Sequence, residues 1–539
     1  MSNLIIPDDL KLINATQSSS AIVDRESLTL YPTGDNVIES GRKSIQSGRI
    51  EFKIPTNPRK SFDLSTLFIH FNFRIVLAGV TKSGAAVLTR IFVHDSIESI
   101  IKSLTVDLAT GQRLEFINDY NALESALNFY CASDYVKGFG SPVMRAGLHS
   151  HIRNRIYHKF QNVTTLTSAS ETTNQFSMPI RLSGVSSPDF VLPSSIFGSG
   201  GFLTITIDLE APVNCIFAQE NAALTNTTGA LAGGGVTDLG GNEIYYELSN
   251  IRMTLDAITY SSEYESMLAN ALASSRLVYP IKTWDVQARQ ISGSGTGQTR
   301  YTETLSFNYS SVNAIFAWFV KSSEQSTHAY AGKDRLWFPD GLKDVQFKVN
   351  GFNVPYSRPI DCTNGASEAY CHLIEALGLL HTAEQYGGLN YDTNSVCLFG
   401  QGQAVLTGGF VAADSFYGKN RDASYGLPVD ENSNTGTETT GPSLIETPFT
   451  IAAPTTTCNQ LLPYQRENSP SHFLIGVNMK KLLRSAPGEI SGENLSNSSG
   501  QIQYELNFTT ANTTSYIMYI AVLHDRFISL SNQQAVISM

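Results

Sequence analysis

The sequence IKSLTVDLATGQRLEFINDYNALESALNFY, residues 101–130, has a counterpart in LKDVQFKVNGFNVPYSRPIDCTNGASEAYCHLIEALGLL, residues 342–380. In each copy three apolar residues alternate with polar ones, and a glycine follows, Gly111 in the first and Gly351 in the second. Alternation with period two is typical of a half-buried β-strand, because successive side chains point to opposite faces. The glycine permits a tight turn. Each copy therefore predicts a strand and a turn. The alternating residues are Leu104, Val106 and Leu108 in the first copy and Val345, Phe347 and Val349 in the second.

A helical pattern follows the turn in both copies. Its apolar residues are spaced three, four and three apart, which places them on one stripe of a helix. The second copy carries about nine extra residues between turn and helix, in a loop with two prolines. The stripe consists of Tyr120, Leu123, Leu127 and Tyr130 in the first copy and of Tyr370, Leu373, Leu377 and Leu380 in the second.

The order of elements around the two copies is also the same. A strand–turn–helix unit is common enough to recur by coincidence, but each unit here is preceded by two strand candidates and followed by a long polar region and two more. We therefore predict two similar β domains in tandem. The preceding candidates are 50–54 and 67–73 in the first half and 305–309 and 316–320 in the second. The following candidates are 203–209 and 251–255 in the first half and 502–508 and 517–523 in the second. In the last of these the alternating apolar residues are Ile517, Tyr519, Ala521 and Leu523.

The predicted domains divide the chain into four parts. Residues 1–45 are expected to form an N-terminal arm, either a disordered tail or a segment that orders against a neighbouring subunit. The first β domain spans 46–260 and the second 276–539. Between them, 261–275 is predicted to be a connecting helix, with Ser262 and Glu265 as an S-x-x-E capping box.

Composition limits the class of protein. The chain has 539 residues, of which 42% are hydrophobic, enough for two or three domains with their own cores. Only 16% are charged, which favours a surface largely covered by loops or other subunits. The net charge of −11 disfavours sequence-independent nucleic-acid binding, which needs Lys and Arg at the phosphates. The six cysteines are scattered, so we expect reduced, mostly buried thiols and folding in the cytoplasm.

The first residues, MSNLIIPDDLKL, lack a basic stretch and a long apolar stretch, so we expect no signal peptide. No apolar run approaches the length of a membrane-spanning helix.

A search for catalytic and metal-binding motifs leads to no site. The sequence contains no HExxH, G-x-S-x-G or Walker motif. We predict no catalytic, cofactor-binding or metal-binding residue and no cofactor. A glycosidase needs only two Asp or Glu side chains brought together by the fold, and nothing in the sequence points to such a pair.

Four features still required interpretation. The Gly-rich 292–298 lacks the Lys-Ser/Thr of a phosphate-binding loop and is interpreted as a turn. His94–Asp95 and His524–Asp525 are neighbours in strands, where adjacent side chains point to opposite faces, so neither is interpreted as a catalytic dyad. The basic cluster within 145–159 is interpreted as a solvated or subunit-contact loop, with an anion or acidic-partner contact as the alternative. It comprises Arg145, His149, His151, Arg153, Arg155, His158 and Lys159.

Two stretches carry a family resemblance. VHDSIESIIKSLTVDLATGQRLEFINDYNALESAL (93–127) is similar to the strand–hairpin–helix segment of the double jelly-roll major capsid proteins of double-stranded DNA viruses, and SGENLSNSSGQIQYELNFTTANTTSYIMYIAVLHDRFISL (491–530) to their last strands. The chain looks closest to the virophage and polinton-like branch. The resemblance is one of pattern and element order, and it covers roughly 45–535.

The resemblance implies an all-β fold of two tandem eight-stranded jelly-roll β-sandwiches with short accessory helices and long loops. It further implies a structural, non-enzymatic protein of the virion capsid, made in the host cytoplasm, that trimerises into pseudo-hexameric capsomers and tiles an icosahedral shell. Capsomer–capsomer contacts, penton proteins and minor capsid proteins would be its partners, and sequence-specific nucleic-acid binding is not expected. The late loops 131–175 and 381–469 would form outer towers and inter-subunit contacts.

Two alternatives remain at this stage. One is a carbohydrate-binding or carbohydrate-active β-sandwich protein, for which a signal peptide and an aromatic-lined cleft would be expected. The other is a single jelly-roll capsid protein with an unrelated second domain, which would not need the repeated helix stripe.

Overall fold

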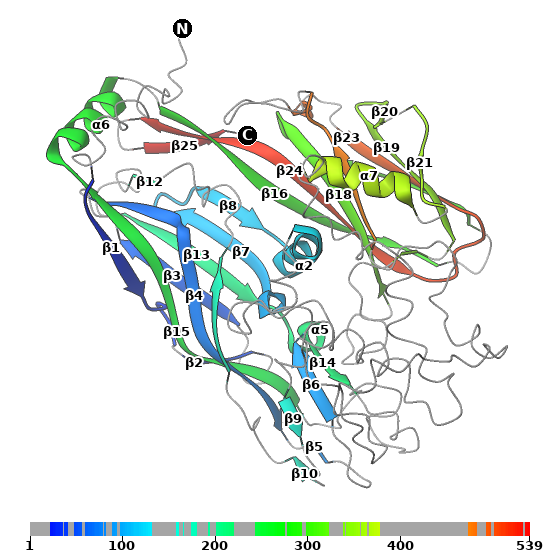
Figure 1. Ribbon diagram of the computed structural model, residues 1–539, viewed down its shortest axis with the longest axis horizontal. Coiled ribbons are helices and arrows are strands. Elements are labelled where there is room, and N and C mark those ends of the chain that lie inside the picture. The colour runs from blue at the N-terminus through cyan, green and yellow to red at the C-terminus, as the bar shows by residue number, and fades with distance from the viewer. Residues whose placement is uncertain are drawn as a thin grey trace, which may run out of the picture.

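The computed structural model consists of two β-sandwiches joined by a helix (Figure 1). It describes residues 22–131, 158–219, 243–377, 473–481 and 492–538, with shorter gaps inside these ranges. Within the described residues, helices are few and short, and the longest has 13 residues. None of these helices has the length and apolar character needed to span a membrane.

The first sandwich has two antiparallel sheets. One sheet has the strand order β1 (Ile22–Leu30), β15 (Glu243–Tyr260), β4 (Lys60–Ala78) and β11 (Asn174–Pro179), with β2 (Val37–Ser40) added to β15 and β12 (Leu192–Pro193) added to β4. The other has the order β3 (Arg49–Pro55), β13 (Phe202–Leu209), β7 (Ile101–Leu108) and β8 (Arg113–Ile117). Short ladders extend the sandwich: β14 (Ile216–Gln219), β6 (Thr89–Val93) and β9 (His158–Phe160) form one, and β10 (Thr165–Leu166) with β5 (Val80–Thr81) another. Its helices are η1 (Ile97–Ile100), α2 (Tyr120–Cys131) and α5 (Pro212–Cys215).

The second sandwich is built in the same way. One sheet has the order β16 (Leu277–Ile291), β24 (Tyr516–Ser531), β18 (Val312–Lys321) and β22 (Leu474–Asn478), with β25 (Gln534–Ser538) on β24. The other has the order β17 (Arg300–Ser306), β23 (Gln501–Phe508), β19 (Leu342–Val349) and β20 (Phe352–Val354), with β21 (Ile360–Asp361) on β19. Helix α7 (Ser367–Ala376) packs on β22, and α6 (Ser262–Ser274) connects the two sandwiches.

The strand order is therefore the same in both halves. Taken along the chain, strands one, eight, three and six of each half form one sheet, and strands two, seven, four and five form the other. This is the order of a jelly roll of eight strands. It confirms the predicted pair of tandem eight-stranded jelly rolls with short accessory helices.

The core of each jelly roll is made by the predicted alternation. Strand β3 buries Ile50, Phe52 and Ile54 and exposes the residues between them. On the helices, Tyr120 and Leu123 of α2 and Leu373 of α7 are buried, as the stripes predicted. Leu380, the last residue of the second stripe, lies outside the described residues.

The apolar face of β24 differs from the prediction. Tyr516, Met518, Ile520 and Val522 are fully buried, whereas of the four expected residues only Ala521 is fully buried and Ile517, Tyr519 and Leu523 are half-buried. Both faces of this strand are apolar in sequence, and β24 lies in the sheet beside β18, which is buried on both faces. Alternation therefore could not identify the inward face.

The beginning of the chain also differs from the prediction. Ile22–Leu30, inside the expected arm 1–45, forms β1 and pairs antiparallel with β15 from Tyr260 to Met253. Strand β1 is an edge strand with mostly exposed side chains, so its sequence IVDRESLTL shows little apolar alternation. Residues 1–21 lie outside the described part of the chain.

The connecting helix, Ser262–Ser274, lies within the predicted range 261–275, but its capping residue differs from the prediction. The Ser261 hydroxyl accepts a hydrogen bond from the Tyr264 amide at 3.4 Å, and the Ser261 carbonyl accepts one from Glu265 at 3.0 Å. Ser261 is thus the N-cap in place of Ser262, because β15 ends at Tyr260 and leaves Ser261 as the first residue free to turn.

Candidate functional site: the seam between the two jelly rolls

The two jelly rolls touch where β8 of the first packs against β16 and β24 of the second. At this seam the Arg526 guanidinium Nη1 donates a hydrogen bond to the Leu114 carbonyl oxygen at 3.3 Å. The Thr283 hydroxyl donates one to Glu115 Oε1 at 3.2 Å. Both contacts join residues far apart in sequence, one from each jelly roll. In Figure 1 the seam lies at the centre of the molecule, between β8 and β16.

A β-bulge on β8 places these two residues. Val106 of β7 pairs with Glu115, but the next residue, Asp107, pairs with Arg113, so Leu114 is an extra residue on β8. A bulge leaves the extra residue out of the ladder and re-aims its neighbours. Leu114 and Glu115 are consequently both fully buried, while Phe116 is 42% exposed.

The seam holds charges away from water. Glu115 is fully buried, and Arg526 is only partly exposed. Burial lowers the pKa of Arg526, while the nearby Tyr309, Glu115 and Asp285 raise it. An arginine stays protonated under these conditions, and the carboxylates of Glu115 and Asp285 favour its charge.

An aromatic layer supports Arg526 from its own jelly roll. The Tyr309 ring stacks on the His524 ring with centroids 3.5 Å apart and 11° between planes. The Tyr309 hydroxyl donates a hydrogen bond to Asp285 Oδ2 at 2.7 Å. Burial, helped by the charge of Asp285, raises the pKa of Tyr309. These contacts fix β16, β24 and the segment after β17 against one another directly behind the seam.

His524 is neutral in this environment. Burial, together with the smaller effect of the Arg526 charge, lowers its pKa to about 3, and the hydrogen bond to the Asp525 backbone carbonyl works in the opposite direction. Its Nδ1 lies 3.4 Å from that carbonyl oxygen. The Asp525 carboxylate instead accepts a hydrogen bond from the Ser311 hydroxyl at 2.6 Å. The arrangement holds strands together and has none of the nucleophile–base geometry of a catalytic triad.

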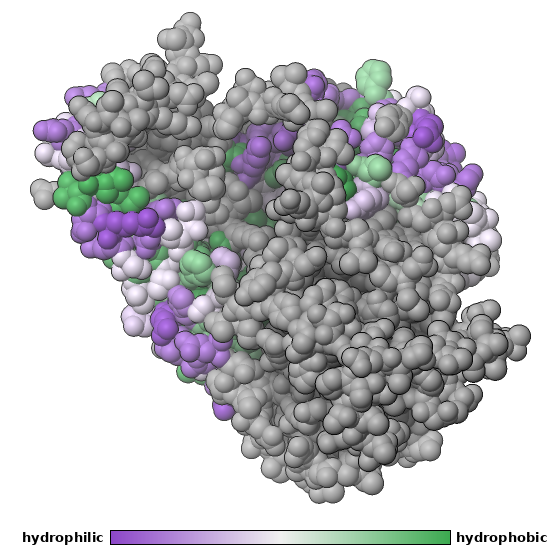
Figure 2. Space-filling model, in the orientation of Figure 1, coloured by the Kyte–Doolittle hydropathy of each residue, from purple (hydrophilic) through white to green (hydrophobic). Residues whose placement is uncertain are grey.

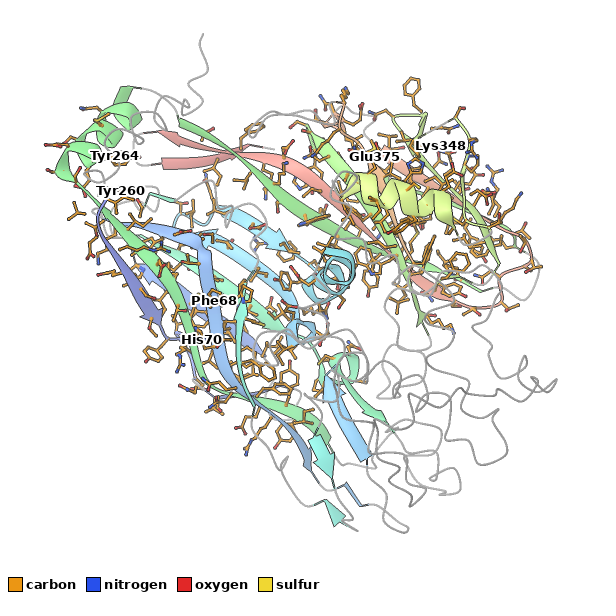
Figure 3. All side chains as sticks on the ribbon, viewed as in Figure 1. Phe68, His70, Tyr260, Tyr264, Lys348 and Glu375 are labelled. Atoms are coloured by element: carbon orange, nitrogen blue, oxygen red, sulfur yellow. The ribbon has the colours of Figure 1, made fainter. Side chains whose placement is uncertain are left out.

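A half-buried histidine lies in the first jelly roll. His70 of β4 is labelled in Figure 3 beside Phe68. Its Nδ1 lies 2.7 Å from the Ser177 hydroxyl and its Nε2 2.8 Å from the Thr254 hydroxyl, so it bridges β4 to both neighbouring strands. Burial lowers its pKa, followed by the charge of Arg252. Its contacts are those of a satisfied structural residue.

The features singled out in the sequence contribute little to the seam. His94 and Asp95 lie outside the described residues, and so does the basic cluster except for His158 and Lys159 in β9. The loops 131–175 and 381–469 are likewise almost entirely outside them. In the ranges that the structure describes, no three His, Cys, Asp or Glu side chains gather to hold a metal. The described cysteines are free thiols: Cys215 and Cys362 are buried and Cys371 is exposed.

Sequence reasoning missed Glu115, Thr283 and Arg526. The only signal was a carboxylate inside the short apolar run RLEFI, next to a phenylalanine. Without the bulge, alternation would place Leu114 and Phe116 on one face and Glu115 on the other, so a charged residue at the seam could not be inferred.

Similarity to known proteins was found among solved structures. No family model matches the sequence, and no curated protein matches it. Among solved structures, the chain is similar to the cryo-EM structure of the Sputnik virophage, with 13% identity, a TM-score of 0.51 and coverage of 96% of this chain and 89% of that one. It also matches the Faustovirus major capsid protein, with 11% identity, a TM-score of 0.49 and coverage of 95% and 91%. The mavirus major capsid protein matches with 10% identity, a TM-score of 0.44 and coverage of 95% and 90%.

At such low identity the likeness to the Sputnik virophage structure concerns the fold, and it extends over nearly the whole chain. The two halves of this chain share one strand order and are joined by a buried seam. The protein therefore has the double jelly-roll fold, as its sequence resemblance implied.

Proposed function

We propose that this chain is a major capsid protein, a structural and non-catalytic subunit that trimerises into pseudo-hexameric capsomers and tiles an icosahedral viral shell. The observation that carries the proposal is the repetition of one jelly roll within a chain. Two similar bodies per chain become six around a threefold axis, which gives the hexagonal outline that tiles a shell.

The seam supports the same role. Two hydrogen bonds cross the seam, from Thr283 to Glu115 and from Arg526 to the Leu114 carbonyl, and they hold the two jelly rolls at one relative position because separation would break both bonds. A capsid subunit needs such rigidity, since an error in the angle between its two bodies would be repeated in every capsomer.

The strand order supports a proposed division of the chain into domains. We propose that the first jelly roll begins at β1 rather than after residue 45, that α6 is the connector, and that the second jelly roll begins at β16. The beginning of β1 lies on the surface of the molecule. The surface of the described residues mixes charged, polar and apolar side chains (Figure 2).

Further partners follow from the same proposal. Capsomers would contact one another and penton and minor capsid proteins, and the virion capsid would be the location of the chain. The net charge of −11 argues against condensing the genome directly. Tight, salt-sensitive binding of DNA by purified trimers would contradict this part of the proposal.

The test is the mass of the purified protein in solution by light scattering, followed by negative-stain imaging of the same fraction. We expect a stable particle of three times 58.8 kDa with a hexagonal outline. A monomer at every concentration would refute the capsomer proposal. In that case glycan binding and glycoside hydrolysis would be tested next.

A further inference from the structure

The seam within one chain has a counterpart that the chain itself leaves open. In the strand order, β8 of the first jelly roll corresponds to β20 of the second, and β16 of the second corresponds to β1 of the first. Within the chain, β8 packs against β16. The corresponding pair, β20 and β1, lies at opposite ends of the molecule, with β20 at the upper right and β1 at the left of Figure 1.

Both open surfaces expose large apolar side chains. At the beginning of β1, Ile22 is 48% exposed and Val23 is 67% exposed, and Figure 2 shows hydrophobic atoms gathered there. On β20, Phe352 is 77% exposed, the highest value among the large hydrophobic residues that the structure describes. Tyr31, just after β1, is exposed as well. Seven large apolar side chains are exposed among the described residues. Four of them lie at or beside the two open surfaces: Ile22, Val23, Tyr31 and Phe352. Val37 of β2, a strand that also pairs with β15, is a fifth.

We propose that the hairpin β19–β20 of one copy packs against β1 and β15 of the next copy, repeating between chains the contact that β7–β8 makes with β16 and β24 within a chain. The partner is a second copy of this chain, and the proposal rests on the proposed capsomer. The contact is head to tail, because each copy offers a different surface at each end. Head-to-tail contacts produce a closed ring when their rotation closes, and three copies would then alternate seams within and between chains.

The inter-chain contact differs from the seam in its chemistry. Val106 of β7 pairs with Glu115, and the equivalent residue of β19, Phe347, pairs with Val354. The buried carboxylate of the seam is therefore replaced by an apolar, half-buried side chain. With Phe352 beside it, the hairpin presents an apolar tip that fits the apolar start of β1. Hydrophobic burial at a standard interface would stabilise the contact.

The hairpin is also built to present Phe352. Asn350 and Gly351 both have positive φ, 51° and 84°, which is the backbone of a two-residue turn between paired strands. Val349 pairs with Phe352 directly across this turn. The first hairpin lacks this feature: its turn is longer and carries Gln112 at its exposed end. An aromatic side chain is therefore present on the open hairpin and absent from the tip of the satisfied one.

The test compares three full-length variants by light scattering across a concentration series. Phe352→Asp and Val23→Asp change exposed residues on the two proposed surfaces, and Gln112→Asp changes the exposed residue at the tip of the first hairpin. We expect both surface variants to raise the concentration at which the trimer dissociates about tenfold or more, with Gln112→Asp unchanged. Circular dichroism and the thermal midpoint of the isolated monomers should match, because these side chains bury little within one chain.

A trimer of wild-type stability in either surface variant would overturn the inference while leaving the capsomer intact. A wild-type protein that is itself monomeric would refute the proposed function instead. Hydrogen exchange gives a second readout that needs no substitution. The amides of 22–30 and 352–354 should exchange more slowly in the wild-type trimer than after dilution to monomer, and equal rates would contradict the contact.

Discussion

The guanidinium of Arg526 in the second jelly roll donates a hydrogen bond to the backbone carbonyl of Leu114 in the first, with Nη1 and O 3.3 Å apart. The acceptor is offered by a bulged residue, and the residue after it, Glu115, supplies the compensating charge. The bulge in β8 thus places the hydrogen-bond acceptor for Arg526 and also brings a carboxylate near its guanidinium.

Removing the guanidinium should weaken the molecule at the seam. In Arg526→Met the Leu114 carbonyl loses its donor and the buried Glu115 carboxylate loses the favourable field of a nearby cation. We expect a loss of about 1–3 kcal/mol in the free energy of unfolding. Calorimetry at fixed protein concentration should show a lower midpoint, with the two jelly rolls unfolding less cooperatively.

Arg300→Met is the matched control for that experiment. Arg300 Nη2 lies 2.7 Å from Glu505 Oε2, but the Arg300 side chain is largely exposed. Exposed ion pairs contribute about 0–1 kcal/mol, so this variant should unfold nearly as the wild type does. If the two variants lose the same stability, the seam has no special role.

The stability of the protein should fall as the pH is lowered toward 3, in part because of His524. In the unfolded chain this histidine takes up a proton near its ordinary pKa of 6.5, whereas in the fold burial lowers its pKa to about 3. Between these values the unfolded state binds more protons, so unfolding becomes more favourable as pH falls, by up to about 1.4 kcal/mol per pH unit. Above about pH 6.5 the contribution is fully present.

His524→Phe isolates this effect, because phenylalanine keeps the stacking on Tyr309 and cannot be protonated. The difference in unfolding free energy between variant and wild type, measured by denaturant titration at pH 7.5 and pH 5, should shift in favour of the variant at pH 5. An unchanged difference would show that the fold does not lower the pKa of His524.

A methyl group at Gly476 should disturb the packing of α7 on β22. A Cβ there would lie 3.0 Å from the Ala376 Cβ, 3.0 Å from Leu373 Cδ1 and 3.1 Å from the Leu373 Cα, so the helix would have to move away. We expect Gly476→Ala to cost about 1–3 kcal/mol, as overpacking does. Gly34→Ala, which meets nothing within 4 Å, is the control and should change stability by less than about 0.5 kcal/mol. Equal thermal midpoints for both variants would contradict this packing.

Thiol modification should distinguish two cysteines of the second jelly roll. Burial, followed by the charges of Asp361, Asp344 and Glu368, raises the pKa of the Cys362 thiol well above its usual value. Cys371 is exposed on α7. Because the thiolate is the reacting form, iodoacetamide at pH 8 should modify Cys371 first, as read by peptide mass mapping. Modification of Cys362 at the same rate would show that the segment around β21 opens in solution.

The strands of both cores could be predicted because each buries one face against its partner sheet. Ile50, Phe52 and Ile54 alternate for that reason, and the repeated pattern at 101–130 and 342–380 identified the tandem. Prediction did less well where that condition fails. Strand β1 has little buried surface, so its residues 22–30 resembled an arm, and β24 is apolar on both faces, so its inward side was assigned wrongly.

By itself, the sequence determined two β domains of matching design and a helix between them, because periodicity and glycine turns are local properties of the chain. The tertiary structure decided which edges stay open, that the β8 bulge buries Glu115, and that Arg526 reaches Leu114 across 412 residues. These depend on strand pairing and on the contact between two separately folded sandwiches. No local pattern encodes a register shift or the position of one sandwich against another, which is why the seam became visible only in three dimensions.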